Sequence, residues 1–343
     1  MANKTINFGI IGCGRVFLKH AESVMQLKNA KLVGVCDIKT DRLEAAKKKY
    51  NCKGYEDYKE MVLQSDIDVV SICTPSGLHA EMTIKAAKAG KHVIVEKPMA
   101  MNLHEADEMI EECKQNNVKL FVVKQNRYNE PIKRLKGALD EKRFGQLFYG
   151  NVTVYWSRPQ EYYDQDPWRG TKAIDGGVLM NQSSHHIDMI RWLMGEVKSV
   201  KAYTDTLTHD IESEDMGIVI LKFKNGAVGS IVATTSVFPH NIEGSVTIMG
   251  TKGTVKVGGV ALNKMEIWKF KDWKNEDELI SESSENPPNV YGFGHFHYIK
   301  DAVESIQKNM PPKIDGKEGR KTLELITRIY QSAKSDKEKE IKL

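Results

Sequence analysis

Hydrophobic and polar residues follow a repeating order along the first part of the chain. Short apolar runs, typical of buried strands, are separated by segments in which apolar residues recur at the spacing of amphipathic helices. The runs are Ile6–Ile11, Leu32–Cys36, Val69–Cys73, His92–Val95 and Leu120–Val123, and the helical segments are Asp41–Tyr50, His79–Ala89 and Leu103–Gln115. Strands that alternate with helices predict β-α-β units and a parallel sheet.

The pattern changes after about residue 125. A series of apolar runs then follows with short turns between them, and Asn225-Gly226 is a favourable hairpin turn. The runs are Leu147–Tyr155, Val197–Tyr203, Gly217–Phe223, Ala227–Ser236, Ser245–Met249 and Thr254–Val257, with helical signals at Pro131–Glu141, His185–Leu193 and Lys321–Lys334. We therefore predict an α/β protein with two domains, residues 1–125 and 126–343, the second containing an antiparallel sheet.

Composition and charge narrow the class of protein. The chain has 343 residues, of which 41% are hydrophobic and 28% charged, as in a globular protein. Lys and Arg number 50 and Asp and Glu 46, and this net charge of +4 is too small to indicate a nucleic-acid partner. The N-terminus resembles neither a signal peptide nor a membrane span, and the five cysteines form no C-x-x-C pair. We expect a cytoplasmic protein that binds neither membranes nor nucleic acid.

A glycine-rich turn follows the first strand. Ile6–Ile11 runs into Gly12-Cys13-Gly14-Arg15-Val16-Phe17. In a dinucleotide-binding turn, the first glycine permits the tight bend and the second lets the backbone approach a pyrophosphate at the N-terminus of the next helix. Phe17 stands where a third glycine or alanine is usual, so this position departs from the full fingerprint.

The second strand ends in an acidic residue. Asp37 lies at about the expected spacing beyond the glycines. A carboxylate at this place accepts hydrogen bonds from the adenosine ribose hydroxyls and repels a 2′-phosphate, which favours NAD over NADP. Lys39 and Arg42 follow closely and either can meet a phosphate, while an ordinary turn aspartate is the other interpretation of Asp37.

Lys97 follows the strand His92–Val95 in the segment Glu96-Lys97-Pro98. An ammonium at the carboxyl end of a parallel strand lies where ligands bind in open α/β folds. There it can take part in proton transfer. A surface lysine at a strand end is the alternative.

A second polar group lies in the second domain. Asn181, His185 and Asp188 are spaced so that they share one face if their segment is helical, whereas His186 points elsewhere and is interpreted as structural. An amide, an imidazole and a carboxylate on one face can bind a sugar hydroxyl and move its proton. Metal binding is the competing interpretation, but asparagine is a poor ligand and we expect no metal.

The order of these motifs resembles that of a known family. After the G-x-G turn and the acid come Thr74-Pro75-Ser76-Gly77-Leu78-His79, then Glu96-Lys97-Pro98, and then a Gly-Gly segment leading to His185 and Asp188. Over nearly the whole chain this order resembles the glucose-fructose oxidoreductase / inositol dehydrogenase / rhizopine catabolism (Gfo/Idh/MocA) family. The resemblance implies an NAD-dependent dehydrogenase acting on CH–OH groups. It also implies a Rossmann domain (1–125) followed by a substrate-binding and oligomerisation domain (126–343) with a large, mostly antiparallel open sheet.

The resemblance also implies the residues of the site. It assigns to the cofactor Gly12, Gly14, Arg15, Val16, Asp37, Thr74, Pro75, His79, Glu96, Lys97 and Gln125. The family's usual catalytic Lys, Asp and His correspond here to Lys97, Asn181 and His185. Asn181 departs from the family pattern, because an amide orients a hydroxyl but cannot accept its proton. The base is then Lys97 or His185.

Aromatic residues and arginines interleave between Tyr155 and Thr171. Arginines pair with carboxylates and phosphates in bidentate fashion, and aromatic rings pack on sugar or base faces. We therefore expect an anionic ligand in contact with Arg158, Trp168, Arg169, Asn181 and His185, with Arg127 as a weaker candidate. A packed loop between sheet and helix is the alternative.

The same stretch, together with Asp175–Gln182 and Asn286–His295, looks like the subgroup that oxidises UDP-N-acetylglucosaminuronic acid at C3 and also carries Asn for Asp. The implied reaction moves hydride from C3 to NAD+ and leaves a 3-keto nucleotide sugar for polysaccharide biosynthesis. The resemblance further implies a homo-oligomer, a dimer or a homotetramer. Two alternatives stay open: a dehydrogenase of inositol or another polyol or sugar, which would not need the arginines, and a non-catalytic nucleotide-binding sensor, which would not need Lys97 and His185 together.

Overall fold

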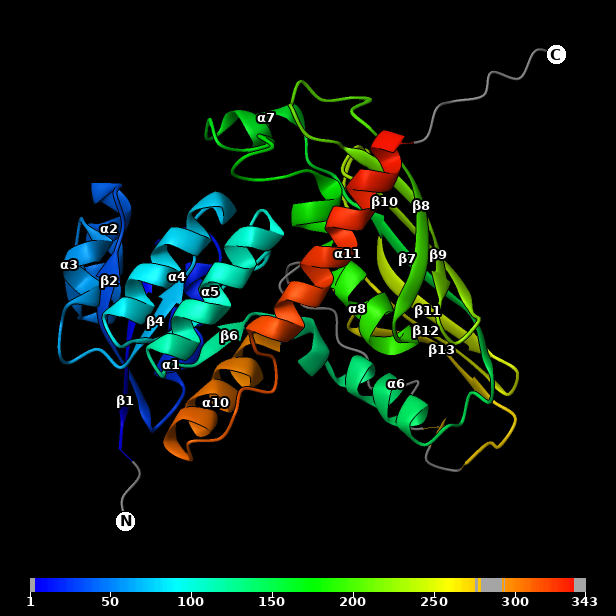
Figure 1. The fold of residues 1–343 in the computed structure, drawn as a ribbon, viewed down its shortest axis with the longest axis horizontal. Coiled ribbons are helices and arrows are strands. Elements are labelled where there is room, and N and C mark those ends of the chain that lie inside the picture. The colour runs from blue at the N-terminus through cyan, green and yellow to red at the C-terminus, as the bar shows by residue number, and fades with distance from the viewer. Residues whose placement is uncertain (1–3, 275–276, 279–291, 293, 336–343) are drawn as a thin grey trace. The chain divides into compact units, whose positions relative to one another are not determined.

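The computed structural model describes residues 4–274, 277–278, 292 and 294–335, and it consists of two compact units (Figure 1). The first comprises Met1–Tyr128, Ala173–Asp175 and Phe293–Leu323, and the second Asn129–Lys172, Gly176–Gly292 and Glu324–Leu343. The boundary predicted at residue 125 lies close to the first of these divisions. A single cut nevertheless misses that the chain returns, because α10 (Gly294–Gln307) buries Tyr298, Ile299 and Ala302 in the core of the first unit.

The first unit contains a sheet of parallel strands. Its strands are β1 (Ile6–Ile11), β2 (Ala30–Cys36), β3 (Lys53–Tyr55), β4 (Val69–Ile72), β5 (His92–Val95) and β6 (Leu120–Val122). They lie in the order β3-β2-β1-β4-β5-β6, and every pairing is parallel. This is the strand order of a Rossmann fold, which confirms the fold class that the motifs implied. The short β3 was not predicted.

Helices cover both faces of this sheet (Figure 1). They are α1 (Phe17–Met25), α2 (Thr40–Tyr50), α3 (Tyr58–Val62), α4 (His79–Lys88), α5 (Leu103–Gln115) and α10, with short turns η1 (Ser76–Leu78) and η2 (Gln125–Tyr128). Asn102 caps α5 by accepting a hydrogen bond from the Glu105 N–H at 3.0 Å. The sequence pattern did not predict α3 or α10.

The second unit contains a mixed sheet. Its strands are β7 (Leu147–Tyr155), β8 (Val197–Asp205), β9 (Met216–Phe223), β10 (Val228–Thr234), β11 (Glu243–Gly250), β12 (Gly253–Gly258) and β13 (Lys264–Phe270). They lie in the order β13-β12-β11-β7-β10-β9-β8, and only the β7–β10 pairing is parallel among these strands. The mostly antiparallel sheet is therefore confirmed, although β13 was missed.

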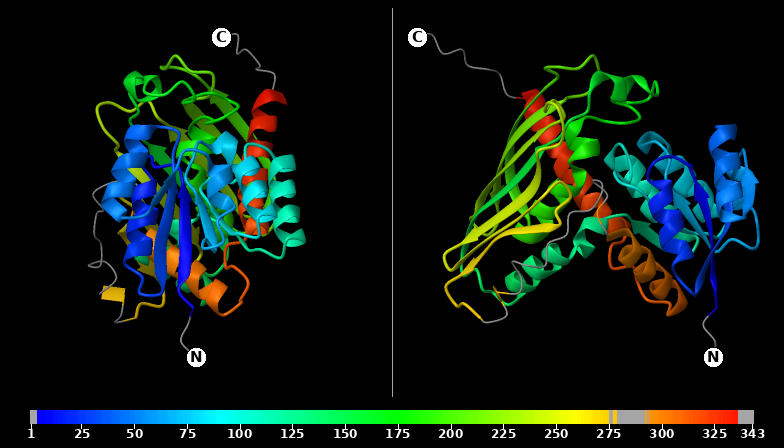
Figure 2. Two further views of the ribbon diagram at one scale, coloured as in Figure 1. Left: turned by 90° about the vertical axis from the view of Figure 1, so that its left-hand side faces the viewer. Right: turned by 180° about the vertical axis from the view of Figure 1, so that it is seen from behind.

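One face of the mixed sheet is covered and the other is open. The helices of this unit are α6 (Glu130–Asp140), α7 (Gln160–Asp164) and α8 (Ser184–Met194), with the turn η3 (Val178–Gln182) before α8. The helix α8 packs on β7 and β11, and no described helix lies on the opposite face (Figure 2). The last helix, α11 (Gly316–Ser335), begins in the first unit and ends in the second.

None of the helices in the described part of the chain has the length and apolar character that a bilayer crossing requires. All five cysteines are free thiols. The cytoplasmic location expected from the sequence stays a prediction. The charged tail after Ser335 lies outside the described residues.

Candidate cofactor and substrate sites

The predicted cofactor residues all lie in the first unit, and the G-x-G turn is at their centre. Gly12 has a φ of +91°, and a Cβ there would lie 2.8 Å from the Cys73 carbonyl oxygen, so glycine is required. A Cβ at Gly14 would meet no described atom within 4 Å, which leaves the backbone accessible to a ligand. The N-terminus of α1 follows, and this arrangement fits a dinucleotide pyrophosphate.

Phe17 explains the departure at the third glycine position. Its side chain is 2% exposed and meets the ring of Tyr50 edge-on, with the ring centres 5.6 Å apart. The first residue of α1 therefore packs against α2 through an aromatic pair, which supplies the helix packing that a small residue usually permits at this place.

Asp37 fastens the glycine-rich turn to the end of β2. Its Oδ2 accepts the Cys13 N–H at 2.7 Å, and its Oδ1 accepts the Lys39 N–H at 2.8 Å. Each carboxylate oxygen keeps a second lone pair, so ribose hydroxyls can still donate to it. Asp37 thus has a structural role beside the cofactor role that the sequence predicted.

Lys97 is half-buried directly after β5, and its neighbour Glu96 faces the core. The Glu96 carboxylate accepts the Lys97 N–H at 3.1 Å and a bond from His20 at 2.8 Å, while His295 Nε2 lies 3.7 Å away. Burial raises the pKa of Glu96, but the hydrogen bond from His20 and the nearby imidazole of His295 outweigh burial and hold the pKa well below its usual range. Burial lowers the pKa of His20, yet Cys73 and Glu96 raise it to about 10.

No sequence pattern revealed this buried ionic cluster. Ligand atoms of His20, Glu96 and His295 lie within 4.8 Å of one another, which is close enough for one metal ion. The ring of His20 is already engaged by Glu96 and, at 2.7 Å, by the Ser71 hydroxyl, so an ion pair accounts for the arrangement. No local motif links the three residues, because they come from α1, the end of β5 and α10. The predicted contact of Glu96 with the cofactor stays a prediction.

His79 joins two of the motifs. Its Nδ1 lies 2.8 Å from the Pro98 carbonyl oxygen and its Nε2 lies 3.0 Å from that of Thr74. Burial lowers the pKa of this histidine, and the bonds to the two carbonyls oppose that shift. His79 therefore holds the Thr74-Pro75 segment beside the segment that carries Lys97, which is a positioning contribution to the predicted cofactor site.

Gln125 and Arg127 lie in η2, and both are buried. Arg127 donates to Glu318 at 2.9 Å, within the first unit. Its guanidinium thus has an acidic partner that the sequence did not reveal. Arg127 is the only predicted sugar contact that belongs to the first unit, and its substrate role stays a prediction.

Asn181 and His185 were expected to share one face if their segment formed a single α-helix. The structure shows that it does not. Asn181 lies in the π-helical turn η3, and α8 begins only at Ser184. The Asn181 N–H bonds to Gly177 O at 2.9 Å, whereas the Ser183 N–H reaches back to Val178 O at 2.8 Å. The wider turn changes the angular spacing between the two side chains, and such turns are frequent at functional sites.

His185 is 8% exposed on the first turn of α8. His186 is buried and stacks edge-on with Trp156, with ring centres 5.6 Å apart, in agreement with its structural interpretation. Asp188 is fully buried, 3.7 Å from Arg191.

The predicted substrate arginines stack on aromatic rings. Arg158 lies 5.1 Å from the ring centre of Trp156 and 5.4 Å from that of Tyr162. Arg169 lies 4.5 Å from the rings of both Tyr162 and Trp168. Tyr162 therefore contacts both guanidinium groups, and these cation–π contacts hold them without using up their hydrogen-bond donors.

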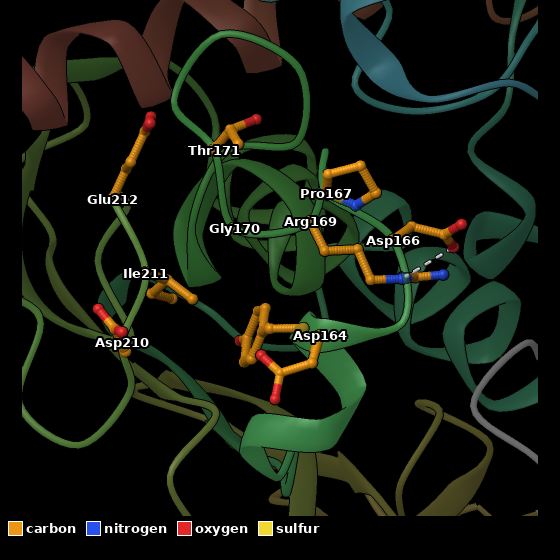
Figure 3. Close-up of a pocket in the computed structure, with 10 residues that line it drawn as sticks. Asp164, Asp166, Pro167, Arg169, Gly170, Thr171, Asp210, Ile211 and Glu212 are labelled. Carbon is orange, nitrogen blue, oxygen red and sulfur yellow. Dashed lines mark ion pairs between the residues drawn. The ribbon is translucent and has the colours of Figure 1, made fainter.

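A cavity of about 260 Å³ lies beside Arg169 (Figure 3). Four carboxylates line it with that one guanidinium, a formal charge of 1 − 4 = −3; they belong to Asp164, Asp166, Asp210 and Glu212. Figure 3 shows Arg169 and Asp166 directed at each other, with Nε and Oδ2 3.5 Å apart. The sequence suggested an anion site here, but the surplus of carboxylates suits hydroxyl groups of a ligand better than its charges.

The segment from Asn286 to Tyr291, which the sequence analysis also associated with the substrate, lies outside the described residues.

Comparison with known proteins agrees with both units. Residues 6–124 match the oxidoreductase family with an NAD-binding Rossmann fold (GFO_IDH_MocA), and residues 136–343 match the C-terminal alpha/beta domain of that family. The WlbA dehydrogenase from Bordetella pertussis, solved with NADH and UDP-GlcNAcA, is 41% identical with a TM-score of 0.91, covering 98% of this chain and 97% of that one.

Two further relatives extend the comparison. The WlbA dehydrogenase from Chromobacterium violaceum, solved with the same ligands, is 43% identical with a TM-score of 0.91, covering 97% of this chain and 95% of that one. Myo-inositol 2-dehydrogenase from Thermotoga maritima is 28% identical over 97% of both chains. This chain belongs to the Gfo/Idh/MocA family of NAD-dependent dehydrogenases.

Proposed function

We propose that this protein oxidises the C3 hydroxyl of UDP-N-acetylglucosaminuronic acid with NAD+, giving the 3-keto nucleotide sugar, NADH and a proton. One observation carries the proposal. The chain is 41% and 43% identical, over nearly its full length, to two dehydrogenases solved with NADH and UDP-GlcNAcA, against 28% for the inositol dehydrogenase. The asparagine at position 181, where the family usually has aspartate, supports the same subgroup.

The chemistry assigns different tasks to the two units. NAD+ supplies the hydride acceptor, and the open turn at Gly14 with the N-terminus of α1 suits its pyrophosphate. Lys97 and His185 are the two groups able to take the hydroxyl proton as C3 loses hydride. Asn181 can only orient that hydroxyl, because its amide has no basic site at neutral pH.

The sugar carboxylate and the diphosphate need cationic partners. Arg158 is the leading candidate, since its guanidinium is half-buried and stacked but has no carboxylate partner among the ion pairs of the described residues. Its Nη1 donates to Ser157 O and to Asn241 Oδ1, which leaves further N–H donors for a ligand. Arg169 is the second candidate, although Asp166 already offsets its charge.

The test is a substrate panel followed by NADH absorbance. UDP-N-acetylglucosaminuronic acid should be oxidised with the highest kcat/KM, UDP-N-acetylglucosamine poorly and myo-inositol not at all. The uncharged sugar should be poor because it leaves an arginine unpaired. Faster turnover of myo-inositol than of either nucleotide sugar would replace the proposal with a polyol dehydrogenase.

We also propose that the protein is a homo-oligomer assembled through the open face of the mixed sheet. Tyr203, Ile218, Ile220 and Val228 are exposed on this face, and Ile220 is 62% exposed in the middle of β9. Exposed Lys201 and Lys222 lie opposite Ile220 and Val228 on the same face. Apolar side chains gathered on an exposed face often mark a protein–protein contact. Sedimentation of the protein and of Ile220→Glu tests this, with a dimer or tetramer expected for the parent and a smaller species for the variant.

A further inference from the structure

The turn that carries Asn181 is capped by two residues from distant parts of the chain. The Glu214 Oε1 accepts the Leu179 N–H at 2.9 Å and the Tyr330 hydroxyl at 2.8 Å. The carbonyl oxygen of Glu214 accepts the Val178 N–H at 2.9 Å. The first N–H groups of a helical turn have no partner inside it, and here one residue supplies two of the missing acceptors.

The contact between Glu214 and the turn is close. A Cβ added to Gly177 would lie 2.2 Å from the Glu214 carboxyl group and 2.4 Å from its carbonyl oxygen. The φ of Gly177 is −96°, so glycine is needed for space rather than for its backbone conformation. The second glycine of the Gly-Gly segment therefore exists to admit Glu214.

Glu214 is itself held from both sides. The Ser213 N–H bonds to Gly170 O at 3.0 Å, and the Asp215 N–H bonds to Asp205 O at 3.1 Å. The Asp215 carboxylate accepts the Leu207 and Thr208 N–H groups, each at 2.9 Å. The backbone on both sides of Glu214 is thus held by hydrogen bonds, while its side chain is bonded to Leu179 and Tyr330.

The capped turn passes its position on to α8. Both the N–H and the hydroxyl of Ser183 bond to Val178 O, at 2.8 and 2.6 Å, and the Ile187 N–H then bonds to Ser183 O at 2.9 Å. Asn181 lies within the turn that these hydrogen bonds stabilise, and His185 lies on the first turn of α8, the helix that follows. Moving Val178 and Leu179 would shift both side chains.

We propose that Glu214 and Tyr330 are positioning residues, which hold Asn181 and His185 in the geometry that oxidation requires. Neither residue contacts the sugar in this proposal; both act through the backbone of η3. The kinetic consequence rests on the proposed function, whereas the structural consequence does not. A shift of about 1 Å in a catalytic group costs as much as 100-fold in rate, so loss of the brace should be visible in turnover.

The experiment compares Glu214→Ala, Glu214→Gln and Tyr330→Phe with the parent. A matched control is Glu196→Ala, an exposed carboxylate of the same unit that is 76% exposed beside Lys224. Hydrogen exchange of the amides of residues 178–183 reports the cap directly, and kcat with the KM for NAD+ reports catalysis. Calorimetric NAD+ binding and the melting temperature report folding.

Glu214→Ala should speed exchange at residues 178–183 and lower kcat about 10-fold or more, with NAD+ affinity unchanged. Glu214→Gln should keep amide exchange and kcat close to those of the parent, because its amide oxygen can accept the same two hydrogen bonds. Tyr330→Phe should give a smaller change and still serves if the alanine variant fails to fold.

Parent-like exchange in Glu214→Ala and Tyr330→Phe would overturn the cap, and fast exchange with parent-like kcat would overturn the positioning role. If the parent does not oxidise UDP-N-acetylglucosaminuronic acid, the proposed function fails, and the exchange results alone decide the cap.

Discussion

The two units hold their ligand-facing turns in different ways. In the first unit, the G-x-G turn is bonded to the end of the next strand, through Gly12 N–H to Cys36 O at 2.8 Å and Cys13 N–H to Asp37. In the second unit, the turn with Asn181 depends on Glu214 and Tyr330, which come from unrelated segments. A motif holds the first turn and tertiary contacts hold the second. Sequence patterns therefore reveal the first kind of site more readily than the second.

The His20–Glu96–His295 cluster lies in the first unit but is held by tertiary contacts, so it is an exception to this contrast. Removing its charge should have the largest effect on stability. Glu96→Gln removes the charge of a buried ion pair, and such a loss costs about 3–5 kcal/mol. Glu304→Gln on α10, where the glutamate is only partly buried and pairs with the exposed Lys308, is the matched control. Chemical denaturation of both variants measures the difference in free energy of unfolding, and a loss below about 1 kcal/mol for Glu96→Gln would refute the ion pair.

The pH dependence of this difference follows from the shifts. The pKa of Glu96 is lower in the folded protein than its ordinary value of 4.5. Its contribution to stability is therefore fully present above pH 4.5 and is lost as the pH falls through the folded pKa. The pKa of His20 is raised, so its contribution is full below 6.5 and is lost as pH rises toward about 10. The difference in melting temperature between the parent and Glu96→Gln should be largest between pH 4.5 and pH 6.5 and should shrink at alkaline pH. A gap that grows with alkaline pH would contradict these assignments.

One catalytic group from each unit provides the next prediction. Lys97→Met and His185→Ala should each lower kcat about 100-fold or more, the usual loss for a positioned acid or base. Both should still bind NAD+ in calorimetry, because neither is needed for the pyrophosphate. Lys88→Met and His104→Ala, at exposed positions, serve as controls. Near-normal turnover in both site variants would refute the assignment, and a loss in only one would identify the base.

A change confined to the second unit sharpens the contrast further. Arg158→Ala should lower kcat/KM for the sugar acid roughly 10- to 150-fold while leaving the uncharged sugar nearly unaffected. Arg158→Lys should not recover fully, since an ammonium loses both the bidentate contact and the stacking on Trp156 and Tyr162. Arg134→Ala on α6 is the control. Equal kcat/KM for the two sugars in the parent would show that Arg158 does not recognise the sugar carboxylate.

The smallest effect concerns the locally held turn. The parent should bind NAD+ more tightly than NADP+, and Asp37→Asn should narrow that preference about 10-fold, because the negative charge is lost while an oxygen still accepts the Cys13 N–H. Asp37→Ala should weaken binding of both cofactors further, since it also frees the turn. Calorimetry with Asp41→Asn as control measures this, and tighter NADP+ binding by the parent would reverse the cofactor assignment.

The sequence predicted the parts of the fold that depend on local patterns. The bounds of β1, β5, α5 and β7 were predicted as the structure has them, because apolar spacing and caps mark these elements directly. The return of α10 to the first unit was not predictable in this way, since its partners lie at the other end of the chain. The ion pair between Arg127 and Glu318 was not predictable either, because Glu318 also lies far along the chain.

The site was predictable by residue type and only partly by geometry. Lys97 and the G-x-G turn lie at the ends of parallel strands, as expected for ligand-binding residues. The π-helical turn at Asn181 differs from the expected helix: it contacts β9 and β10, and its Leu179 N–H is bonded to Glu214, which also accepts the Tyr330 hydroxyl. The acidic surplus in the cavity beside Arg169 comes from joining two separate loops, which no spacing along the chain reveals.

Oxidation at C3 by NAD+ can be tested by following deuterium from a labelled sugar into NADH. UDP-N-acetylglucosaminuronic acid carrying deuterium at C3 is incubated with the protein and NAD+, and the NADH formed is analysed by mass spectrometry. We predict NADH that contains the deuterium, together with an unlabelled 3-keto sugar. NADH without deuterium would mean that another carbon is oxidised, and the absence of NADH would mean that this nucleotide sugar is not the substrate; either result would refute oxidation at C3.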